Sequence, residues 1–182
     1  DSRFSDELRI TPAENMAGVE QAVGQVRMAI EAQLSMGLPN TPMAGAAVRV
    51  VSGNFITAQP YGIHNGIDFG QTGNVRSVDA EAISNQLEQN NVVLLSPIGD
   101  SPTAETFNLR AEDIANETAI ALQADNLIFI MENNGVTDKD GGLLQQLNIT
   151  QAEQWQKNHG QKNDDDTITQ SHLNKAAHAC HE

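Results

Sequence analysis

Hydrophobic residues occur along the chain in short runs that polar or glycine-rich segments separate. Val92–Leu95 is an unbroken apolar run, and a second run lies within Asn126–Met131. Unbroken runs of this length are typical of strands buried on both faces. Ala111–Gln123 has a helical pattern between them, and Pro97–Asn108 reads as a polar loop. Strand, crossover helix and strand predict a right-handed βαβ unit over Asn91–Glu132.

The helix predicted in this unit has two unlike faces. Small and apolar side chains share one stripe, formed by Ile114, Ala115, Thr118, Ala119 and Leu122. Polar side chains take the opposite stripe, formed by Glu112, Asp113, Asn116 and Glu117. This amphipathic pattern predicts that the first stripe packs on the sheet and that the second faces solvent.

An earlier helix is expected to begin at Thr11-Pro12-Ala13-Glu14, a sequence that combines a capping hydroxyl, a proline and a glutamate. Gly37 and Pro39 are expected to end it. One apolar stripe of this helix is expected to face the core; its residues are Val19, Val23, Val26, Ile30 and Leu34.

The segment between this helix and the βαβ unit reads as β structure. Ala46–Ser52 and Phe55–Ala58 have strand patterns, and the glycine-punctuated Pro60–Val78 predicts a β-hairpin lobe. Asp79 is expected to cap a short helix that buries two apolar side chains, those of Ile83 and Leu87.

Two further helices are expected nearer the end of the chain. One begins at Thr150-Gln151-Ala152-Glu153, which repeats the capping-box pattern, and the other spans Leu173–Cys180. Between them, the acidic segment Gly160–Asp166 has the composition of a disordered loop.

Composition excludes several classes of partner. The formal net charge of −14 argues against nucleic acid and against an anionic membrane surface, because both bind through Lys and Arg. The chain has 182 residues, which suits a single domain, and its single cysteine, Cys180, fits a reducing cytoplasm. Metal binding at His178, Cys180 and His181 is not supported, since no second ligand pair has zinc-like spacing.

Candidate binding residues lie where the predicted strands end. Ligands of open α/β sheets sit beyond the carboxyl ends of the strands, which here means Ser96–Arg110 and Glu132–Val136. Arg9 immediately precedes the first helix, and Asn108 precedes the central one. An arginine and an asparagine amide can hold a carboxylate together, although purely structural roles also fit both residues. Arg110 is the one cation of this loop, so a phosphoryl-transfer site is poorly supported.

Several stretches together resemble the amino-acid-kinase-like domain of bacterial N-acetylglutamate synthases. The stretches are Leu8-Arg9-Ile10-Thr11, Val50–Pro60, Gly66-Ile67-Asp68-Phe69, Gly73-Asn74-Val75-Arg76, Phe107–Ala115 and Gly135-Val136-Thr137-Asp138. The resemblance implies a three-layer αβα sandwich of the amino-acid-kinase type, with a mainly parallel sheet and a β-hairpin lobe. It also implies that residues 1–182 are one such domain, truncated at both ends, without the acetyltransferase domain.

The resemblance also suggests site residues. Arg9 and Asn108 match the residues that hold acetylglutamate in the related kinase, whereas Arg110 and Glu112 stand where that kinase has an asparagine and its organising aspartate. The lysines that Glu112 would align are not evident, so the kinase reaction is expected to be lost. No catalytic or metal-binding residue is therefore expected in this chain.

The resulting hypothesis is a cytoplasmic regulatory and oligomerisation domain of a glutamate N-acetyltransferase that starts arginine biosynthesis. The resemblance implies L-arginine as effector, glutamate or N-acetylglutamate as further small-molecule partners, and a homo-oligomer. No cofactor is expected in this chain, and acetyl-CoA would be a co-substrate of the missing domain. Two alternatives stay open: a fragment of N-acetylglutamate kinase, and a non-enzymatic amino-acid-binding module.

Overall fold

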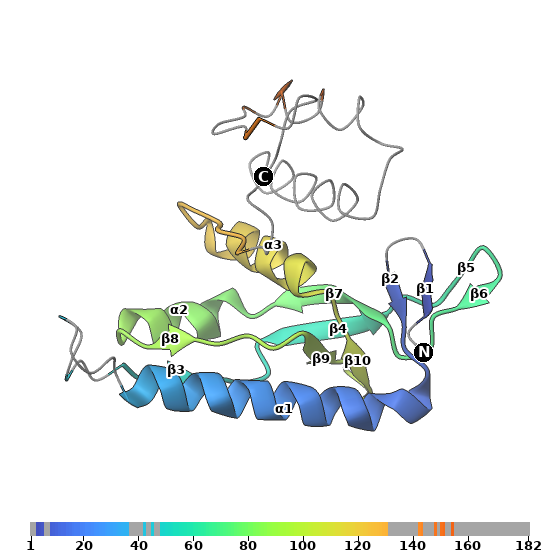
Figure 1. Ribbon diagram of the computed structural model, residues 1–182, viewed down its shortest axis with the longest axis horizontal. Coiled ribbons are helices and arrows are strands. Elements are labelled where there is room, and N and C mark those ends of the chain that lie inside the picture. Colours follow the sequence, from blue (N-terminus) through green and yellow to red (C-terminus); the bar gives the residue numbers. More distant parts are fainter. Residues whose placement is uncertain are drawn as a thin grey trace. The chain divides into compact units, whose positions relative to one another are not determined.

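The computed structural model describes residues 3–5, 8–36, 48–130 and eight single positions, which are 42, 45, 142, 143, 148, 150, 151 and 154 (Figure 1). The chain divides into two compact units, Asp1–Ile114 and Ala115–Glu182, and each is considered by itself below.

The first unit opens with a small hairpin and a long helix. Strands β1 (Arg3–Ser5) and β2 (Leu8–Ile10) pair antiparallel, and helix α1 (Ala13–Met36) follows (Figure 1). The helix begins within the predicted start and is described as far as Met36; the predicted stop at Gly37 and Pro39 lies outside the described residues.

The predicted apolar stripe of α1 is only partly correct. Val26 is 59% exposed and Leu34 is 39% exposed, so neither belongs to a closed core. Val23, Val26 and Ile30 instead line an apolar cavity of about 270 Å³ together with Leu94, Leu95 and neighbouring residues. The apolar stripe of α1 is therefore present in the sequence, but the described part of the protein does not cover all of its side chains.

Two short parallel strands form a sheet of their own. Strands β3 (Val50–Val51) and β8 (Val92–Val93) pair in register, and the Leu94 amide extends the ladder by donating to the Val51 carbonyl at 2.9 Å. Val92 is 42% exposed, so the prediction that this run is buried on both faces is wrong. Its exposure fits a strand with one strand neighbour in the described part of the chain.

The larger sheet of the first unit has four strands in the order β10-β9-β4-β7 (Figure 1). Its members are β4 (Ile56–Pro60), β7 (Gly73–Val78), β9 (Ile98–Asp100) and β10 (Thr106–Asn108). The β4–β9 pair is parallel and the other two pairs are antiparallel. The helices and mixed sheets confirm the predicted α/β class.

The prediction of a polar loop over Pro97–Asn108 is wrong, because this segment contains the β9–β10 hairpin. In its register Phe107 lies opposite Gly99, and both residues are buried. Three-residue strands with one large apolar side chain give almost no periodic signal in the sequence. Tertiary packing of Phe107 on the core therefore decides the conformation here.

The glycine-punctuated segment forms a hairpin, as predicted. Strands β5 (Ile63–His64) and β6 (Ile67–Asp68) pair antiparallel around a turn in which Asn65 and Gly66 have φ angles of 52° and 78°. Positive φ at both positions is what a two-residue hairpin turn requires.

Helix α2 (Ala80–Glu88) confirms the predicted cap. The Asp79 carboxylate accepts a hydrogen bond from the Ala82 amide at 2.9 Å. Ile83 is buried as expected, but Leu87 is 46% exposed, so its predicted burial is wrong. Leu87 lies in the last turn of α2, directly before the chain leaves the helix, where the side chain has less of the protein to cover it.

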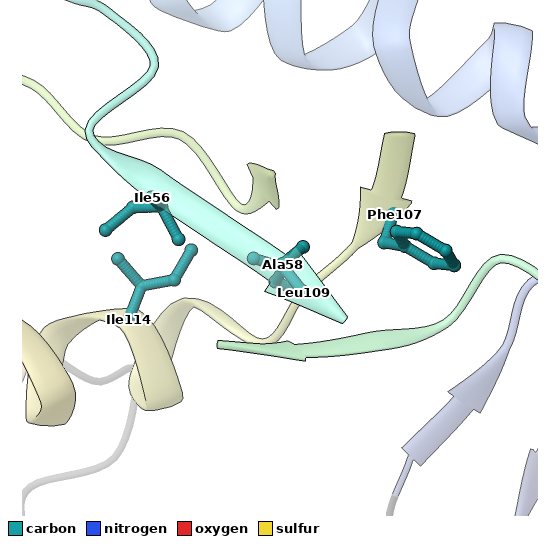
Figure 2. Packing of buried hydrophobic residues seen from close by; sticks show 5 residues of the cluster. All are labelled: Ile56, Ala58, Phe107, Leu109 and Ile114. Atoms are coloured by element: carbon teal, nitrogen blue, oxygen red, sulfur yellow. The ribbon is translucent and has the colours of Figure 1, made fainter. Parts of the chain in front are cut away.

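The core of the first unit joins the four-stranded sheet to the first turn of helix α3 (Ala111–Leu122) (Figure 2). Its buried members come from β4, β10 and the segment that follows β10; they are Ile56, Ala58, Phe107, Leu109 and Ile114. Because Phe107 and Leu109 flank Asn108, core packing fixes the backbone at a predicted site residue.

In the second unit two predictions are wrong. Asn116 was expected on a solvent-facing stripe of α3 but is only 5% exposed, and its side-chain oxygen has no partner among the described residues. The run within Asn126–Met131 was expected as a buried strand, yet Ile128 is 80% exposed and Ile130 is 97% exposed. Residues 124–130 have no strand conformation, because no described strand pairs with them.

The capping box predicted at Thr150 lies two residues earlier. The Gln151 amide donates to the Asn148 side-chain oxygen at 2.8 Å, and the Asn148 amide donates to the Gln151 side-chain oxygen at 3.0 Å. This reciprocal pair is a capping box with Asn148 as the capping residue, which replaces Thr150. The predictions for Glu132–Val136, Gly160–Asp166, Leu173–Cys180 and the His178, Cys180 and His181 group lie outside the described residues.

Candidate functional site

Two buried threonines connect the end of β2 to the rest of the first unit. The Thr72 hydroxyl donates to the Arg9 carbonyl and accepts the Thr11 amide at 3.0 Å. Thr11 is 1% exposed and Thr72 is 4% exposed, so these bonds are shielded from water. They fix the backbone on both sides of Ile10, just before α1 begins.

Asn108 joins this arrangement from β10. Its side-chain amide donates to the Thr11 hydroxyl at 3.0 Å, and its backbone amide donates to the Gln71 carbonyl at 2.8 Å. The Gln71 amide in turn donates to the Thr11 carbonyl at 2.7 Å. We call Thr11, Gln71, Thr72 and Asn108 the threonine hub.

The threonine hub also contains a buried polar atom without a partner. In the part of the chain that the structure describes, the side-chain oxygen of Gln71 is buried and has no hydrogen-bond donor. Such a group costs free energy unless a donor reaches it, and such groups are uncommon in native proteins.

The structure places the four predicted site residues in two pairs. Arg9 lies in β2 with an exposed side chain. Its carbonyl accepts a hydrogen bond from the Thr72 hydroxyl, and Thr72 in turn forms a parallel β-bridge with Asn108. Arg110 and Glu112 lie two and four residues beyond Asn108, with the Arg110 Nε 4.0 Å from a Glu112 carboxylate oxygen. Both side chains are about one-quarter exposed, so this ion pair is screened by water.

A polar cavity of about 280 Å³ lies at part of the predicted rim, where the chain leaves β3 and β8. We call it the turn cavity. Polar side chains and glycines line much of it; they are Arg27, Ser52, Gly53, Asn54, Ser96, Gly99 and Asp100, with Ile56, Leu95 and Ile98 adding apolar surface.

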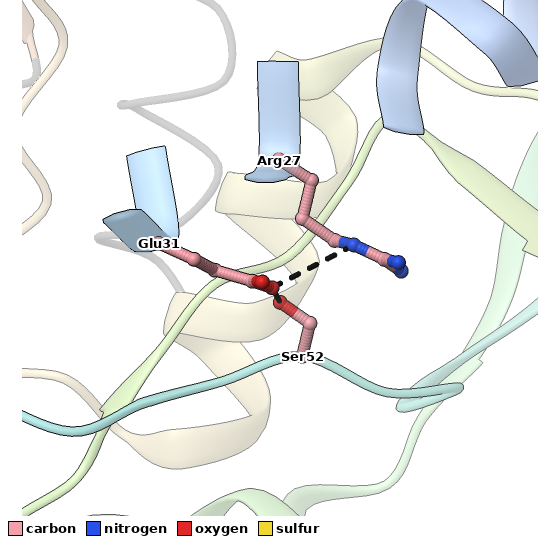
Figure 3. Close-up of polar contacts among 3 residues, drawn as sticks. All are labelled: Arg27, Glu31 and Ser52. Carbon is pink, nitrogen blue, oxygen red and sulfur yellow. Dashed lines mark hydrogen bonds and ion pairs between the residues drawn. The ribbon is translucent and has the colours of Figure 1, made fainter. Parts of the chain in front are cut away.

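One wall of the turn cavity is organised by Glu31 of α1. Its carboxylate accepts a hydrogen bond from the Ser52 hydroxyl at 2.7 Å, and the same oxygen lies 3.6 Å from the Arg27 Nε (Figure 3). Arg27 and Glu31 are one helical turn apart, which brings their side chains together. Glu31 therefore connects α1 to the turn that follows β3.

Sequence reasoning found Arg9 and Asn108 but missed the residues that position them. Thr72 and Gln71 lie in a glycine-rich segment without a periodic pattern, so nothing in the sequence distinguishes them from turn residues. The Arg27 and Glu31 pair did carry a signal, because opposite charges at this spacing on a helix interact.

The described residues restrict the chemistry of the site. They include no lysine, since the four lysines are at positions 139, 157, 162 and 175. They also include no group of three or more metal-ligating side chains. Among the described helices, none combines the length and apolarity needed to cross a membrane.

A family model identifies the class of protein. The model of the amino acid kinase family matches residues 2–181, and the chain therefore belongs to that family. Within it, the chain is similar to proteins named amino-acid acetyltransferase. It is 51% identical over 151 residues to one from Ralstonia nicotianae and 44% identical over 173 residues to one from Photobacterium profundum. These matches cover 83% and 95% of this chain, but 34% and 39% of the relatives.

Solved structures of N-acetylglutamate synthase are also similar to this chain. N-acetylglutamate synthase from Neisseria gonorrhoeae, complexed with coenzyme A and L-arginine, superposes with a TM-score of 0.87 at 30% identity. The superposition covers 98% of this chain and 40% of that one. The predicted amino-acid-kinase type of fold is thereby confirmed, and the chain spans about a third of the length of the relatives it matches.

Proposed function

We propose that this chain is the regulatory and assembly region of a cytoplasmic glutamate N-acetyltransferase. The whole protein would transfer the acetyl group of acetyl-CoA to L-glutamate at the start of arginine biosynthesis, under feedback inhibition by L-arginine. Residues 1–182 would form one amino-acid-kinase-like domain of a homo-oligomer, and acetyl transfer would belong to a different domain. Neither nucleic acid nor membrane is a proposed partner.

The observation that carries the proposal is the 51% identity to an amino-acid acetyltransferase over 83% of this chain. A second support is the likeness to a synthase whose structure contains coenzyme A and L-arginine. The alternative of an N-acetylglutamate kinase fragment draws on the amino acid kinase family match. It gains little from the site, because the described residues supply arginines but no lysine to bind phosphates.

We expect the intact protein to acetylate L-glutamate, with inhibition by L-arginine, and residues 1–182 alone to show neither acetyl transfer nor ATP-dependent phosphorylation of N-acetylglutamate. Release of free coenzyme A and of ADP measures the two reactions on both proteins. Coenzyme A release by the short chain would contradict the assignment of acetyl transfer to another domain. ADP formation that depends on N-acetylglutamate would favour the kinase alternative.

We further propose that Arg9 and Asn108 bind the carboxylate and amide groups of a glutamate-like ligand, with Arg110 and Glu112 at the same site. The threonine hub supports this role, because it fixes the Arg9 backbone and the Asn108 side chain in place. Preorganised groups lose less entropy when a ligand binds.

Replacing either residue should weaken binding of N-acetyl-L-glutamate to the intact protein. We expect the Arg9→Gln substitution to weaken it roughly tenfold or more, and Asn108→Ala roughly threefold to tenfold, because hydrogen bonds from charged groups contribute more than neutral ones. Isothermal titration calorimetry measures both values. Arg76→Gln, which removes an exposed arginine from β7, is the matched control. Equal affinities in all three variants would remove Arg9 and Asn108 from the site.

A further inference from the structure

The turn of the β5–β6 hairpin has a sequence with chemistry of its own. Asn65 and Gly66 form this turn, and they are the one Asn-Gly pair in the part of the chain that the structure describes. The backbone nitrogen that follows an asparagine can attack the side-chain carbonyl carbon of that asparagine and close a five-membered ring. A following glycine hinders this attack least, because it has no Cβ atom beside its nitrogen.

No hydrogen bond holds back either of the two reacting groups. Asn65 is exposed, and among the described residues its side chain has no hydrogen-bond partner. The backbone amide of Gly66 likewise donates to no acceptor in that part of the chain. A Cβ atom built at Gly66 would have no neighbour within 4 Å, so the turn is open on this side. Water therefore reaches the atoms that would react.

The hairpin can open locally at a small cost. Each of its strands has two residues, and all of these are exposed. Hairpins of two short strands are marginally stable, and exposed segments with few buried contacts open most easily. Opening is needed because Asn65 has a fixed left-handed conformation with a φ angle of 52°, whereas ring closure requires the Gly66 nitrogen to rotate toward the side chain.

The base of the hairpin is anchored independently of its turn. Phe69 is fully buried, and its ring centroid lies 4.6 Å from that of Tyr61. The Phe69 amide donates to the Gly62 carbonyl at 3.2 Å, and the Phe69 carbonyl accepts the Thr11 amide at 3.3 Å. A chemical change in the turn should therefore leave the rest of the first unit folded, so that changed molecules accumulate.

We propose that Asn65 is a site of spontaneous deamidation, with water as the only co-reactant. The Gly66 amide nitrogen loses its proton and forms a bond to the Asn65 Cγ. The Cγ–Nδ2 bond breaks, and the side-chain nitrogen leaves as ammonia with that proton. Water then opens the succinimide ring: cleavage of the new Cγ–N bond gives aspartate, and cleavage of the original backbone C–N bond gives isoaspartate.

Both products change the hairpin. Aspartate adds a negative charge to a chain whose formal net charge is already −14. Isoaspartate adds a methylene group to the backbone of a turn that holds His64 opposite Ile67, and this lengthening removes the register of a two-residue turn. The converted fraction increases with time, so the turn records the age of the molecule. The inference goes beyond the proposed function and does not depend on it.

Ageing of the intact protein under mildly alkaline conditions tests the proposal, because base removes the amide proton. Peptide mass spectrometry measures, at each asparagine, the mass gain that marks conversion of an amide into an acid. Asn90 is the internal control, since it is also exposed and has a φ angle of 60°, but Asn91 follows it. We expect Asn65 to convert at least roughly tenfold faster than Asn90, because a Cβ atom hinders the Asn91 nitrogen. Equal rates at the two positions would overturn the proposal.

Two glycine substitutions test the ring closure. Gly66→Ala should slow conversion of Asn65 roughly tenfold or more, whereas the control Gly62→Ala, at a glycine that does not follow asparagine, should leave the rate within roughly twofold. Repeating the measurement in denaturant removes any difference in hairpin opening between the variants. Isoaspartate should appear together with aspartate, because direct attack of water on the side chain yields aspartate alone. Aspartate without isoaspartate, or an unchanged rate in Gly66→Ala, would overturn the mechanism.

Discussion

The Phe107→Ala substitution should destabilise the protein by about 3–5 kcal/mol. Phe107 is 4% exposed and belongs to the buried cluster that also contains Ile56, Ala58, Leu109 and Ile114 (Figure 2). Removing the ring deletes apolar surface from the core and leaves a cavity that rigid β-sheet neighbours cannot close. The melting temperature should fall by roughly 6–20 °C, and circular dichroism of the intact protein measures this shift.

Phe4→Ala is the matched control for this prediction. Phe4 lies in β1 and is 66% exposed, so the same atoms are removed from a side chain that water already reaches. We expect its effect to stay within about 1 kcal/mol. Similar losses in the two variants would show that Phe107 does not belong to the stabilising core.

The Gly70→Ala substitution should also be strongly destabilising. Gly70 has a φ angle of 58°, and a Cβ atom at this position would lie 2.6 Å from the Thr11 carbonyl oxygen. The left-handed conformation costs an alanine about 1–2 kcal/mol, and relief of the overlap adds about 1–3 kcal/mol. Since the Thr11 carbonyl accepts the Gln71 amide, the threonine hub must shift as well. Thermal unfolding of the intact protein should show a loss of about 2–5 kcal/mol.

The Gly62→Ala substitution separates the cost of the left-handed backbone conformation from the cost of steric overlap. Gly62 has a φ angle of 85°, yet a Cβ atom there would have no neighbour within 4 Å. Its cost should therefore be the conformational part alone, about 1–2 kcal/mol. If Gly70→Ala were no more destabilising than Gly62→Ala, the close approach of the Thr11 carbonyl to Gly70 would not contribute to the loss of stability.

The parts of the fold that the sequence predicted are those with a strong local signal. Helix α1 starts near Thr11, and Asp79 caps α2, because capping residues act on their own neighbours. The hairpin around Gly66 follows from the backbone freedom of glycine. The β9–β10 hairpin was missed, since Phe107 packs in a cluster with residues of β4 that are distant in the sequence. The burial of Asn116 was missed because the pattern of α3 places it on the polar stripe.

The candidate site was predictable in its polar residues but not in its architecture. Arg9 and Asn108 stood out as polar groups beside predicted element ends. Their connection runs through Thr72, whose role depends on a fold that brings residues 61 and 63 positions apart into hydrogen-bond contact. No local pattern reports such a pairing. The position of the turn cavity was predicted only in part. Ser96–Arg110 was expected at a ligand site and contributes one wall, but the contributions of Arg27 and of the turn after β3 were not expected, because the cavity forms where three separate segments meet.

The bond from Asn108 to Thr11 spans 97 residues, and this separation has a consequence during protein synthesis. At typical translation speeds the ribosome needs roughly 5–20 s to produce the intervening chain. During that interval Thr11, just before α1, lacks its hydrogen-bond partner Asn108. The polar groups of the newly made segment therefore stay hydrogen-bonded to water. Slowing or speeding translation between these two positions should therefore alter the yield of native protein more than the same change placed after residue 110.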